Sequence, residues 1–493
     1  MKTKLLFLAL LSTITFYSQT QIGNDINGEA YDDHSGCSVS SSSDGNVIAI
    51  GAFWNDENGA NSGHVRVYQN LSSVWTQIGA DIDGEAYSDY SGASVSLSSD
   101  GNIVAIGAYR NNGTESSDSG HVRVYQNLSG VWTQIGADID GELFEDHSGI
   151  SVSLSSDGNI VAIGADKNNG NGNDSGHVRV YQNLSSVWTQ IGDDIDGEAQ
   201  NDQSGFSVSL SSDGSIVAIG ATNNVGNGID FPGHVRVYQN ISDVWTQIGE
   251  DIDGETGGDS SGWSVSLSSN GSIVAIGAPL NDGNGLNSGH VRVYQNLSSV
   301  WTQIGADIDG EAQNDQSGFS VSLSSDGSIV AIGAPLNDGN GLNSGHVRIY
   351  QNISGVWTQI GTDINGEAVD DESGTSVCLS SDGSTVFIGA PLNDGNGLNS
   401  GHVRVYDLSA LLSLEDNEIG KNFTVYPNPV NNHLQIQLST TLEFKKATIY
   451  NYYGQLVLQS KTTPINVSGL SSGVYFLEVE TNKGKGIKKI IKN

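Results

Sequence analysis

The chain has 493 residues, of which 64 are glycine, 7% are aromatic and one is methionine. Frequent turn-forming residues and scarce large side chains favour many short strands joined by tight turns, and so an all-β protein. Residues 19–414 carry nine basic against fifty acidic side chains, a net charge of −41. Such a field repels phosphate backbones and anionic lipids, which excludes nucleic acid and membrane surfaces as partners, whereas it attracts divalent cations.

The first eighteen residues have the pattern of a secretory signal peptide. Lys2 and Lys4 precede a short apolar run, residues 5–11, and a polar stretch that ends at Ser18. A basic start, a short apolar run and a polar end are typical of an export signal that is cleaved, here near Ser18. No segment has the roughly twenty apolar residues that a membrane-spanning helix needs. We therefore expect an exported chain without membrane insertion.

The segment Val-Trp-Thr-Gln-Ile-Gly recurs at a nearly fixed interval. A fixed period of this length indicates a fold built of repeated units. Its tryptophans lie 56 or 57 residues apart, at Trp75, Trp132, Trp188, Trp245, Trp301 and Trp357.

Each repeat unit divides into four predicted strands. In the second copy the first and third segments alternate between polar and apolar residues, and the second is a continuous apolar run, as in a central strand that is buried on both faces. Four antiparallel strands per unit are typical of a propeller blade. In this copy the predicted strands lie at residues 94–98, 103–106, 121–125 and 131–135.

The number of copies predicts a closed ring of seven blades. The Gly-His-Val-Arg strand and the Thr-Gln-Ile-Gly strand each occur seven times, but the two sets are out of phase. The first Thr-Gln-Ile-Gly, residues 20–23, precedes any complete unit, and the last unit ends near Tyr406 without its own fourth strand. We therefore expect the N-terminal strand to complete blade seven, which would remove the exposed edges of an open array.

The repeats resemble the FG-GAP repeat of integrin α-subunit propellers and of exported bacterial proteins. The likeness rests on Ser-Gly-Phe-Ser-Val (204–208), Ile-Gly-Ala-Pro (276–279) and Gly-His-Val-Arg-Val-Tyr, and it extends over residues 19–406. It implies a seven-bladed β-propeller and says little about function. The Asp-x-Asp-x-Asp-Gly calcium loop of the integrin type is reduced here to Ser-Ser-Asp-Gly or Ser-Ser-Asn-Gly. That loop is therefore not expected to bind calcium.

A different acidic cluster is our candidate calcium site. Each unit carries Asp-Ile-Asp-Gly-Glu, or Asp-Ile-Asn-Gly-Glu in the first and last copies, followed by a further Asp, and carboxylates spaced in this way around a glycine can surround a hard cation. The alternative is a solvated acidic loop whose carboxylates cap turns or pair with the repeated arginines. Two copies of the cluster are Asp81, Asp83, Glu85 and Asp89, and Asp307, Asp309, Glu311 and Asp315.

The candidate ligand-binding residues lie in the loop after the second strand, where the copies differ most. Blades five to seven share Pro-Leu-Asn-Asp-Gly-Asn-Gly-Leu-Asn-Ser-Gly there, whereas blades one to three do not. Aromatic and basic side chains in an acidic surface are typical of carbohydrate-binding and protein-binding sites. The candidates are Phe53, Trp54, Tyr109, Arg110 and Lys167.

Three side chains that recur in the blades favour a structural role. A His and an Arg occupy the same strand position in every blade, so we interpret them as architectural contacts rather than catalytic or metal-binding groups. The repeated Trp is interpreted as blade packing. The two cysteines, Cys37 and Cys378, differ by three positions in equivalent strands, an offset of about 10 Å that favours unpaired, buried thiols.

After a predicted linker at residues 407–422, the C-terminal region, residues 423–493, reads as a short antiparallel, Ig-like β-sandwich. It resembles the type IX secretion C-terminal sorting domain, which implies that the secretion machinery is a partner and that the cargo is secreted or attached to surface lipopolysaccharide. An ordinary Ig-like binding module is the alternative. The residues that carry the resemblance are Tyr426, Pro427, Asn428, Pro429, Gly473, Tyr475 and Lys488.

Two functions remain open from the sequence. We favour a non-enzymatic recognition or adhesion propeller with an extracellular glycan or protein ligand and, at most, calcium as a cofactor. The alternative is a secreted polysaccharide-degrading enzyme, because acidic pairs that could serve a glycosidase are abundant. No metalloprotease motif or phosphate loop occurs, so metalloprotease and nucleotide-binding functions lack support.

Overall fold

The computed structural model describes residues 19–112, 118–225, 231–412, 423–439, 442–451, 456–482 and 484–493. These residues form two compact units, one that ends at Leu411 and one that begins at Leu412, and each is described by itself. The expected signal peptide, residues 1–18, and most of the expected linker, residues 413–422, lie outside the described residues. Over the described ranges, no helix is long and apolar enough to cross a membrane.

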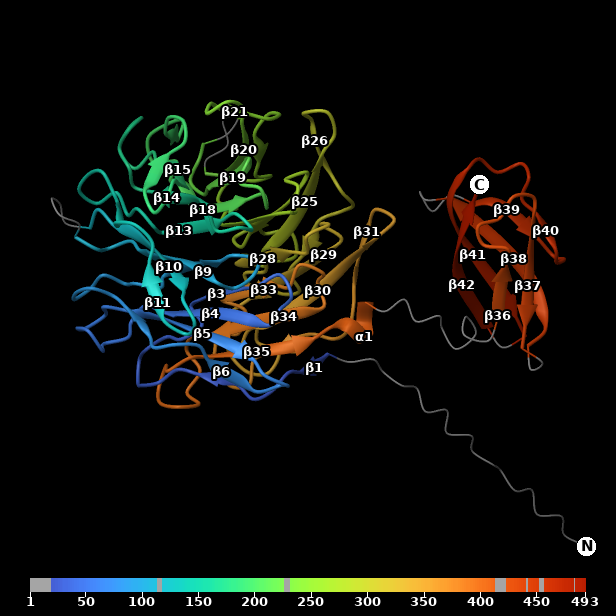
Figure 1. Cartoon of the computed structure of the whole chain (residues 1–493), viewed down its shortest axis with the longest axis horizontal. Coiled ribbons are helices and arrows are strands. Elements are labelled where there is room, and N and C mark those ends of the chain that lie inside the picture. Colours follow the sequence, from blue (N-terminus) through green and yellow to red (C-terminus); the bar gives the residue numbers. More distant parts are fainter. Residues whose placement is uncertain are drawn as a thin grey trace, which may run out of the picture. The chain divides into compact units, whose positions relative to one another are not determined.

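The first unit is the expected seven-bladed β-propeller, with its sheets fanned around a common centre (Figure 1). In each blade four antiparallel strands follow one another from the inside outwards. The innermost strands are β3 (Ser38–Ser41), β8 (Ser94–Leu97), β13 (Ser151–Leu154), β18 (Ser204–Leu210), β23 (Ser264–Leu267), β28 (Ser320–Leu323) and β33 (Ser376–Leu379). The second strands are β4 (Val47–Ala52), β9 (Ile103–Ala108), β14 (Ile160–Ala165), β19 (Ile216–Ala221), β24 (Ile273–Ala278), β29 (Ile329–Ala334) and β34 (Thr385–Ala390).

The third strand of each blade carries the repeated His and Arg, and the fourth carries the Trp of blades one to six. The third strands are β5 (His64–Asn70), β10 (His121–Asn127), β15 (His177–Asn183), β20 (His234–Asn240), β25 (His290–Asn296), β30 (His346–Ile353) and β35 (His402–Asp407). The fourth strands are β6 (Trp75–Gln77), β11 (Trp132–Gln134), β16 (Trp188–Gln190), β21 (Trp245–Gln247), β26 (Trp301–Gln303) and β31 (Val356–Gln359), with β1 (Thr20–Gln21) in blade seven.

Each sheet also has a fifth, two-residue strand, which the sequence did not predict. It pairs with the start of the third strand, as in Ile82 with Val65 and Asp83 with His64. The Asp-Ile-Asp segment of each repeat is therefore extended, with Ile82 buried, rather than folded into a turn. These strands are β2 (Ile26–Asn27), β7 (Ile82–Asp83), β12 (Ile139–Asp140), β17 (Ile195–Asp196), β22 (Ile252–Asp253), β27 (Ile308–Asp309) and β32 (Ile364–Asn365).

The ring is closed by the N-terminal strand, as expected. Thr20 pairs with Asp407 and Gln21 with Tyr406, so β1 completes the blade built from the last repeat. Around the centre, one backbone hydrogen bond links each blade to the next and the last blade to the first, with N···O distances of 2.8–2.9 Å. This cyclic set runs through Ser43, Ser99, Ser156, Ser212, Ser269, Ser325 and Ser381.

The contact between neighbouring blades, which we call a seam, explains the repeated Arg and Trp. In the seam between blades one and two, Arg123 donates to the Asp83 carbonyl at 2.6 Å and lies 3.7 Å from the Glu85 carboxylate. Trp132 donates its indole N–H to the Ile78 carbonyl of blade one at 2.7 Å. The Arg contact recurs at the other six seams and the Trp contact at five of them, so both residues join blades, in agreement with the structural interpretation.

The seam between blades seven and one, which we call the closing seam, differs in its packing. Phe387 is fully buried at a position where the other six blades have Ala, and Ser41 stands where the other six have Leu. Phe387 packs with Ile48 and Trp75 of blade one, and its ring centroid lies 5.8 Å from that of Trp75. The large residue in blade seven is therefore matched by a small one in blade one.

The two cysteines are free thiols, as expected, and both are half-buried rather than fully buried. Cys378 lies at the closing seam, where its Sγ is 3.3 Å from Ser41 Oγ. Cys37 precedes β3, and its thiol donates to the Gly51 carbonyl at 3.3 Å. Desolvation raises the pKa of Cys37 to about 11, so this thiol is not an activated nucleophile.

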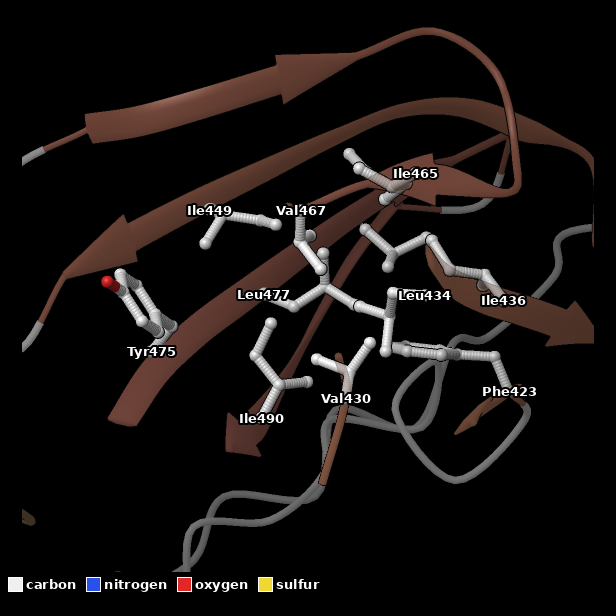
Figure 2. Close-up of a cluster of buried hydrophobic side chains, with 12 residues drawn as sticks. Phe423, Val430, Leu434, Ile436, Ile449, Ile465, Val467, Tyr475, Leu477 and Ile490 are labelled. Carbon is white, nitrogen blue, oxygen red and sulfur yellow. The ribbon is translucent and has the colours of Figure 1, made fainter. Parts of the chain in front are cut away.

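After the short helix α1 (Ser409–Leu412), the second unit is a β-sandwich of two sheets. Apolar side chains from both sheets, among them Leu434, Ile449 and Leu477, form one core between them (Figure 2). The first sheet consists of β36 (Phe423–Tyr426), β37 (His433–Leu438) and β40 (Ile465–Asn466). The second consists of β39 (Leu456–Ser460), β38 (Phe444–Asn451), β41 (Gly473–Thr481) and β42 (Gly484–Lys492).

The Tyr-Pro-Asn-Pro motif holds the last strand of this sandwich. Asn428 donates to the Lys489 carbonyl at 3.0 Å and accepts from the Ile491 amide at 2.8 Å. Tyr475 donates its hydroxyl to the Ser471 carbonyl at 2.9 Å, and the Lys488 ammonium lies 5.5 Å from the centre of the Phe423 ring. The residues that suggested a sorting domain therefore support one another at the C-terminal end of the chain.

Candidate functional site

The divergent loops lie on one face of the propeller, which we call the loop face. Ser38 at the start of β3 pairs with Gly51 near the end of β4, so the segment before the innermost strand and the loop after the second strand meet at this edge. In blade one that loop is residues 53–63, and its second part, residues 60–63, accepts backbone hydrogen bonds from residues 84–91, which lead to blade two. These backbone bonds fix the loop on the scaffold.

Three of the five candidate residues, Phe53, Trp54 and Tyr109, lie in one continuous row of rings. Phe53 contacts Tyr90 at 5.8 Å between ring centroids, Tyr90 stacks on Tyr109 at 5.7 Å, and Tyr109 meets His147 at 5.2 Å. At the other end Trp54 stacks on His34 at 4.1 Å. We call this set the inner row: His34, Phe53, Trp54, Tyr90, Tyr109 and His147.

Arg110 is the cation of the inner row. Its guanidinium carbon lies 5.1 Å from the centre of the Tyr90 ring and 5.7 Å from that of Tyr109, and its side chain is exposed. Burial lowers the pKa of His34, although the Asp32 carboxylate opposes this, and burial raises the pKa of Tyr109. At neutral pH these shifts favour the uncharged forms of His34 and Tyr109, beside the permanent positive charge of Arg110.

Three further aromatic side chains stand on the linkers that enter blades one to three. Tyr31, Tyr87 and Phe144 are 64%, 68% and 56% exposed. The equivalent positions in the other four linkers are Gln200, Gly257, Gln313 and Val369, so this set, which we call the outer row, also belongs to one half of the ring.

Lys167, the fifth candidate, occupies the same loop position in blade three, where its backbone N–H donates to the Asp146 carbonyl at 3.3 Å. The neighbouring Asp166 is buried and lies 3.6 Å from His147 Nδ1. The structure thus gathers Phe53, Trp54 and Tyr109 into one row, with Arg110 beside it, and leaves Lys167 at its end.

Sequence reasoning missed His34, Tyr90 and His147 of the inner row and all of the outer row. Both sets occupy positions that vary between copies, which is the signal that identified the loop and could have identified them. The innermost strand of the opposite half begins with a second aromatic group, Phe206, Trp263 and Phe319, whose neighbouring rings are 4.7 and 5.3 Å apart.

The four carboxylates of one candidate calcium cluster lie in different settings. Asp81 Oδ2 is 3.6 Å from His64 in its own blade, whereas Glu85 reaches Arg123 of the next blade. Asp89 accepts the backbone amides of Glu85 and Ala86, at 3.2 and 2.8 Å. Calcium binding by these residues, and by Asp307, Asp309, Glu311 and Asp315, stays a prediction.

Two described grooves belong to the repeated architecture. One, of about 340 Å³, is lined by Asp25, Tyr68 and Trp75, and another, of about 420 Å³, is lined by the equivalent Asp251, Tyr294 and Trp301. Grooves that recur at equivalent seams give no single asymmetric site, so the divergent loop face remains the better candidate.

Comparisons with known proteins agree with a propeller that is followed by a sorting domain. Residues 251–294 and 306–350 match the FG-GAP repeat, and residues 424–493 match the secretion system C-terminal sorting domain. No curated protein matches the chain. A crystal structure from Bacteroides uniformis, provisionally assigned as a 6-phosphogluconolactonase, is similar with a TM-score of 0.49 at 10% identity, over 69% of this chain and 88% of that one. The chain is a secreted or surface-attached protein in which an FG-GAP-repeat propeller precedes a type IX sorting domain.

Proposed function

We propose that the protein is a non-enzymatic recognition or adhesion propeller and that its inner row binds an extracellular glycan. One observation carries the proposal: a continuous row of aromatic rings with an exposed Arg110 occurs on one half of a ring whose blades are otherwise near-copies. Sugar rings present C–H faces that pack on aromatic rings and hydroxyls that accept from a guanidinium. The exposed outer row extends the same kind of surface towards the rim.

The opposite half of the loop face supplies a built-in contrast. Where blades one and two have Phe53-Trp54 and Tyr109-Arg110, blades five to seven have Pro-Leu, and the strands that flank the loop pair in the same register in all these blades. The divergence thus changes surface chemistry without changing the scaffold, as expected when function depends on loops held by a rigid frame.

The test is binding of the mature chain to a panel of algal and bacterial polysaccharides, while new reducing ends are also measured. The variant Trp54→Leu/Arg110→Leu, which introduces the residue of blades five to seven, should weaken capture at least about 30-fold, the effect of losing about 2 kcal/mol at a binding hot spot. Its melting temperature should not change, because blades five to seven already have Leu at this loop position. The matched control, Leu336→Ala in blade six, should bind normally.

Retained capture by the double variant would refute the assignment of the inner row. Steady release of reducing ends would replace the adhesin with the polysaccharide-degrading enzyme. The calcium prediction is tested by measuring the melting temperature with calcium and with the calcium chelator EGTA. A calcium-dependent propeller should melt at a lower temperature in EGTA.

A further inference from the structure

At every seam the repeated His faces two carboxylates from different parts of the chain. In the seam between blades one and two, His121 Nδ1 lies 3.9 Å from Glu85, on the linker, and 3.9 Å from Asp138, which precedes the fifth strand. These separations are too long for hydrogen bonds. The same three residue types meet at the other described seams.

At the closing seam, a loop of blade one brings a fourth side chain that could bind a metal ion. Glu29, Glu57, His64 and Asp81 each offer one atom, and these four atoms all lie within 4.8 Å of one another. Glu57 stands in the loop after β4, where blades three, five, six and seven have Gly170, Gly283, Gly339 and Gly395. The four-ligand set is thus a product of sequence divergence rather than of the repeat.

His64 is the buried member of this set and is aimed into it. Its side chain is 1% exposed, its Nδ1 has no hydrogen-bond partner, and that atom lies 3.6 Å from Asp81 Oδ2. A buried, unpartnered nitrogen among carboxylates lacks the proton or cation that would satisfy it.

The carboxylates of the set are crowded by one another. Burial raises the pKa of Glu29, and the negative charges of Asp81 and Glu57 act in the same direction. Arg66 opposes this, but it lies against one oxygen of Glu29, Oε1, at 3.3 Å. Three carboxylates and one guanidinium leave an excess of negative charge, which a divalent cation would offset.

We propose that Glu29, Glu57, His64 and Asp81 bind one divalent first-row transition-metal ion of the Zn²⁺ or Mn²⁺ type. Oxygen ligands with one imidazole suit these ions, whereas the harder Ca²⁺ prefers oxygen alone. Metal–ligand bonds of about 2.0–2.2 Å place tetrahedral ligand atoms about 3.4 Å apart, so ligand atoms that are up to 4.8 Å apart must draw together by as much as about 1.4 Å. Glu57 is exposed and on a loop, so it can make that movement. The ion would tie this loop, which also carries Trp54, to the linker and to β5.

The decisive variant replaces Glu57 by glycine, the residue that blades three, five, six and seven have at this loop position. Calorimetric titration of the EDTA-treated mature chain with ZnCl₂ or MnCl₂ should show one site above the weak background of the acidic surface, and Glu57→Gly should weaken it at least about tenfold without lowering the melting temperature. In the opposite direction, Gly283→Glu would complete the set of Glu255, His290 and Asp307 in blade five and should give a second site. Spin-echo spectra of the bound Mn²⁺ should show a coordinated nitrogen that is absent in His64→Gln.

Equal titration curves for the wild type and Glu57→Gly, or only many weak and equivalent sites, would overturn the proposal. Calcium binding that matches Mn²⁺ in affinity, without nitrogen coordination, would also overturn it. None of these measurements uses a glycan, so the outcome is independent of the proposed adhesin function.

Discussion

The closing seam has different residues from the six internal seams at equivalent packing positions. At each internal seam a Ser hydroxyl accepts the amide of a Leu in the next blade, as Ser96 does from Leu154 at 2.9 Å, and an Ala lies beneath. At the closing seam Cys378 and Ser41 replace the Ser and the Leu, and Phe387 replaces the Ala. Near-identical blades could pair in many registers, so a distinct size match at one seam identifies which blades are the ends.

Acidification should affect all seven seams together and gives the largest expected effect. Burial lowers the pKa of each repeated His to about 4 from 6.5. The unfolded chain therefore binds more protons between these values, so stability is full above about pH 6.5 and falls as the pH drops towards 4. At pH 5 each imidazole therefore lowers the free energy of unfolding by on the order of 1–2 kcal/mol, compared with its value above pH 6.5.

Calorimetric melting between pH 8 and pH 5 should show this fall for the propeller transition. The half-exposed glutamates, such as Glu85, whose pKa is raised by burial, act with the opposite sign, but solvent screens them. A melting temperature that is constant over this range would contradict the role of the seven buried imidazoles.

The size match at the closing seam predicts the next largest effect. Phe387→Ala leaves a cavity in a fully buried site and should destabilise the propeller by about 3–5 kcal/mol in denaturant unfolding. Adding Ser41→Leu recreates the pattern of an internal seam and should recover part of that loss. If the two changes are strictly additive, the pair is not coupled.

The reverse transplant is the control for this pair. Ala331→Phe should overpack the seam between blades six and seven by about 1–3 kcal/mol, and Leu379→Ser should relieve it.

The indole hydrogen bond gives the smallest expected effect. Trp301→Phe keeps most of the packing but leaves the Ile248 carbonyl without its donor at 2.7 Å, a loss of about 1 kcal/mol. In blade seven the Trp position is held by Gln19, which donates to the Thr362 carbonyl. Gln19→Ala should change stability less than Trp301→Phe in the same denaturant titration, and the opposite order would show that the closing blade depends on this contact more than the internal ones.

Much of the fold could be predicted from the sequence because it depends on local periodicity. The period of 56 to 57 residues, the alternation in the first and third strands and the out-of-phase Thr-Gln-Ile-Gly copies predict seven blades and their closure. The fifth strand was missed because two residues such as Ile82 and Asp83 carry no periodic signal, and their extension depends on pairing with β5.

The candidate site could be predicted only in part. Phe53-Trp54 and Tyr109-Arg110 are adjacent pairs in variable loops, and so they stand out in the sequence. Tyr90 joins them only because the linker before blade two folds back along the loop after β4. The metal-ligand set was missed for the same reason, since Glu29 and Asp81 meet across a seam that the sequence does not show.

The pairing of β1 with β35 has a consequence for the order of events during export. These strands stand at opposite ends of the propeller sequence, so β1 lacks its partner until nearly all of the propeller has been synthesised. An earlier fragment has unpaired edges and pays the closure entropy of a very long loop late in folding. The sorting domain begins at residue 424, after β35 ends at Asp407, so a chain that displays the complete sorting signal has also received every strand needed to complete its ring.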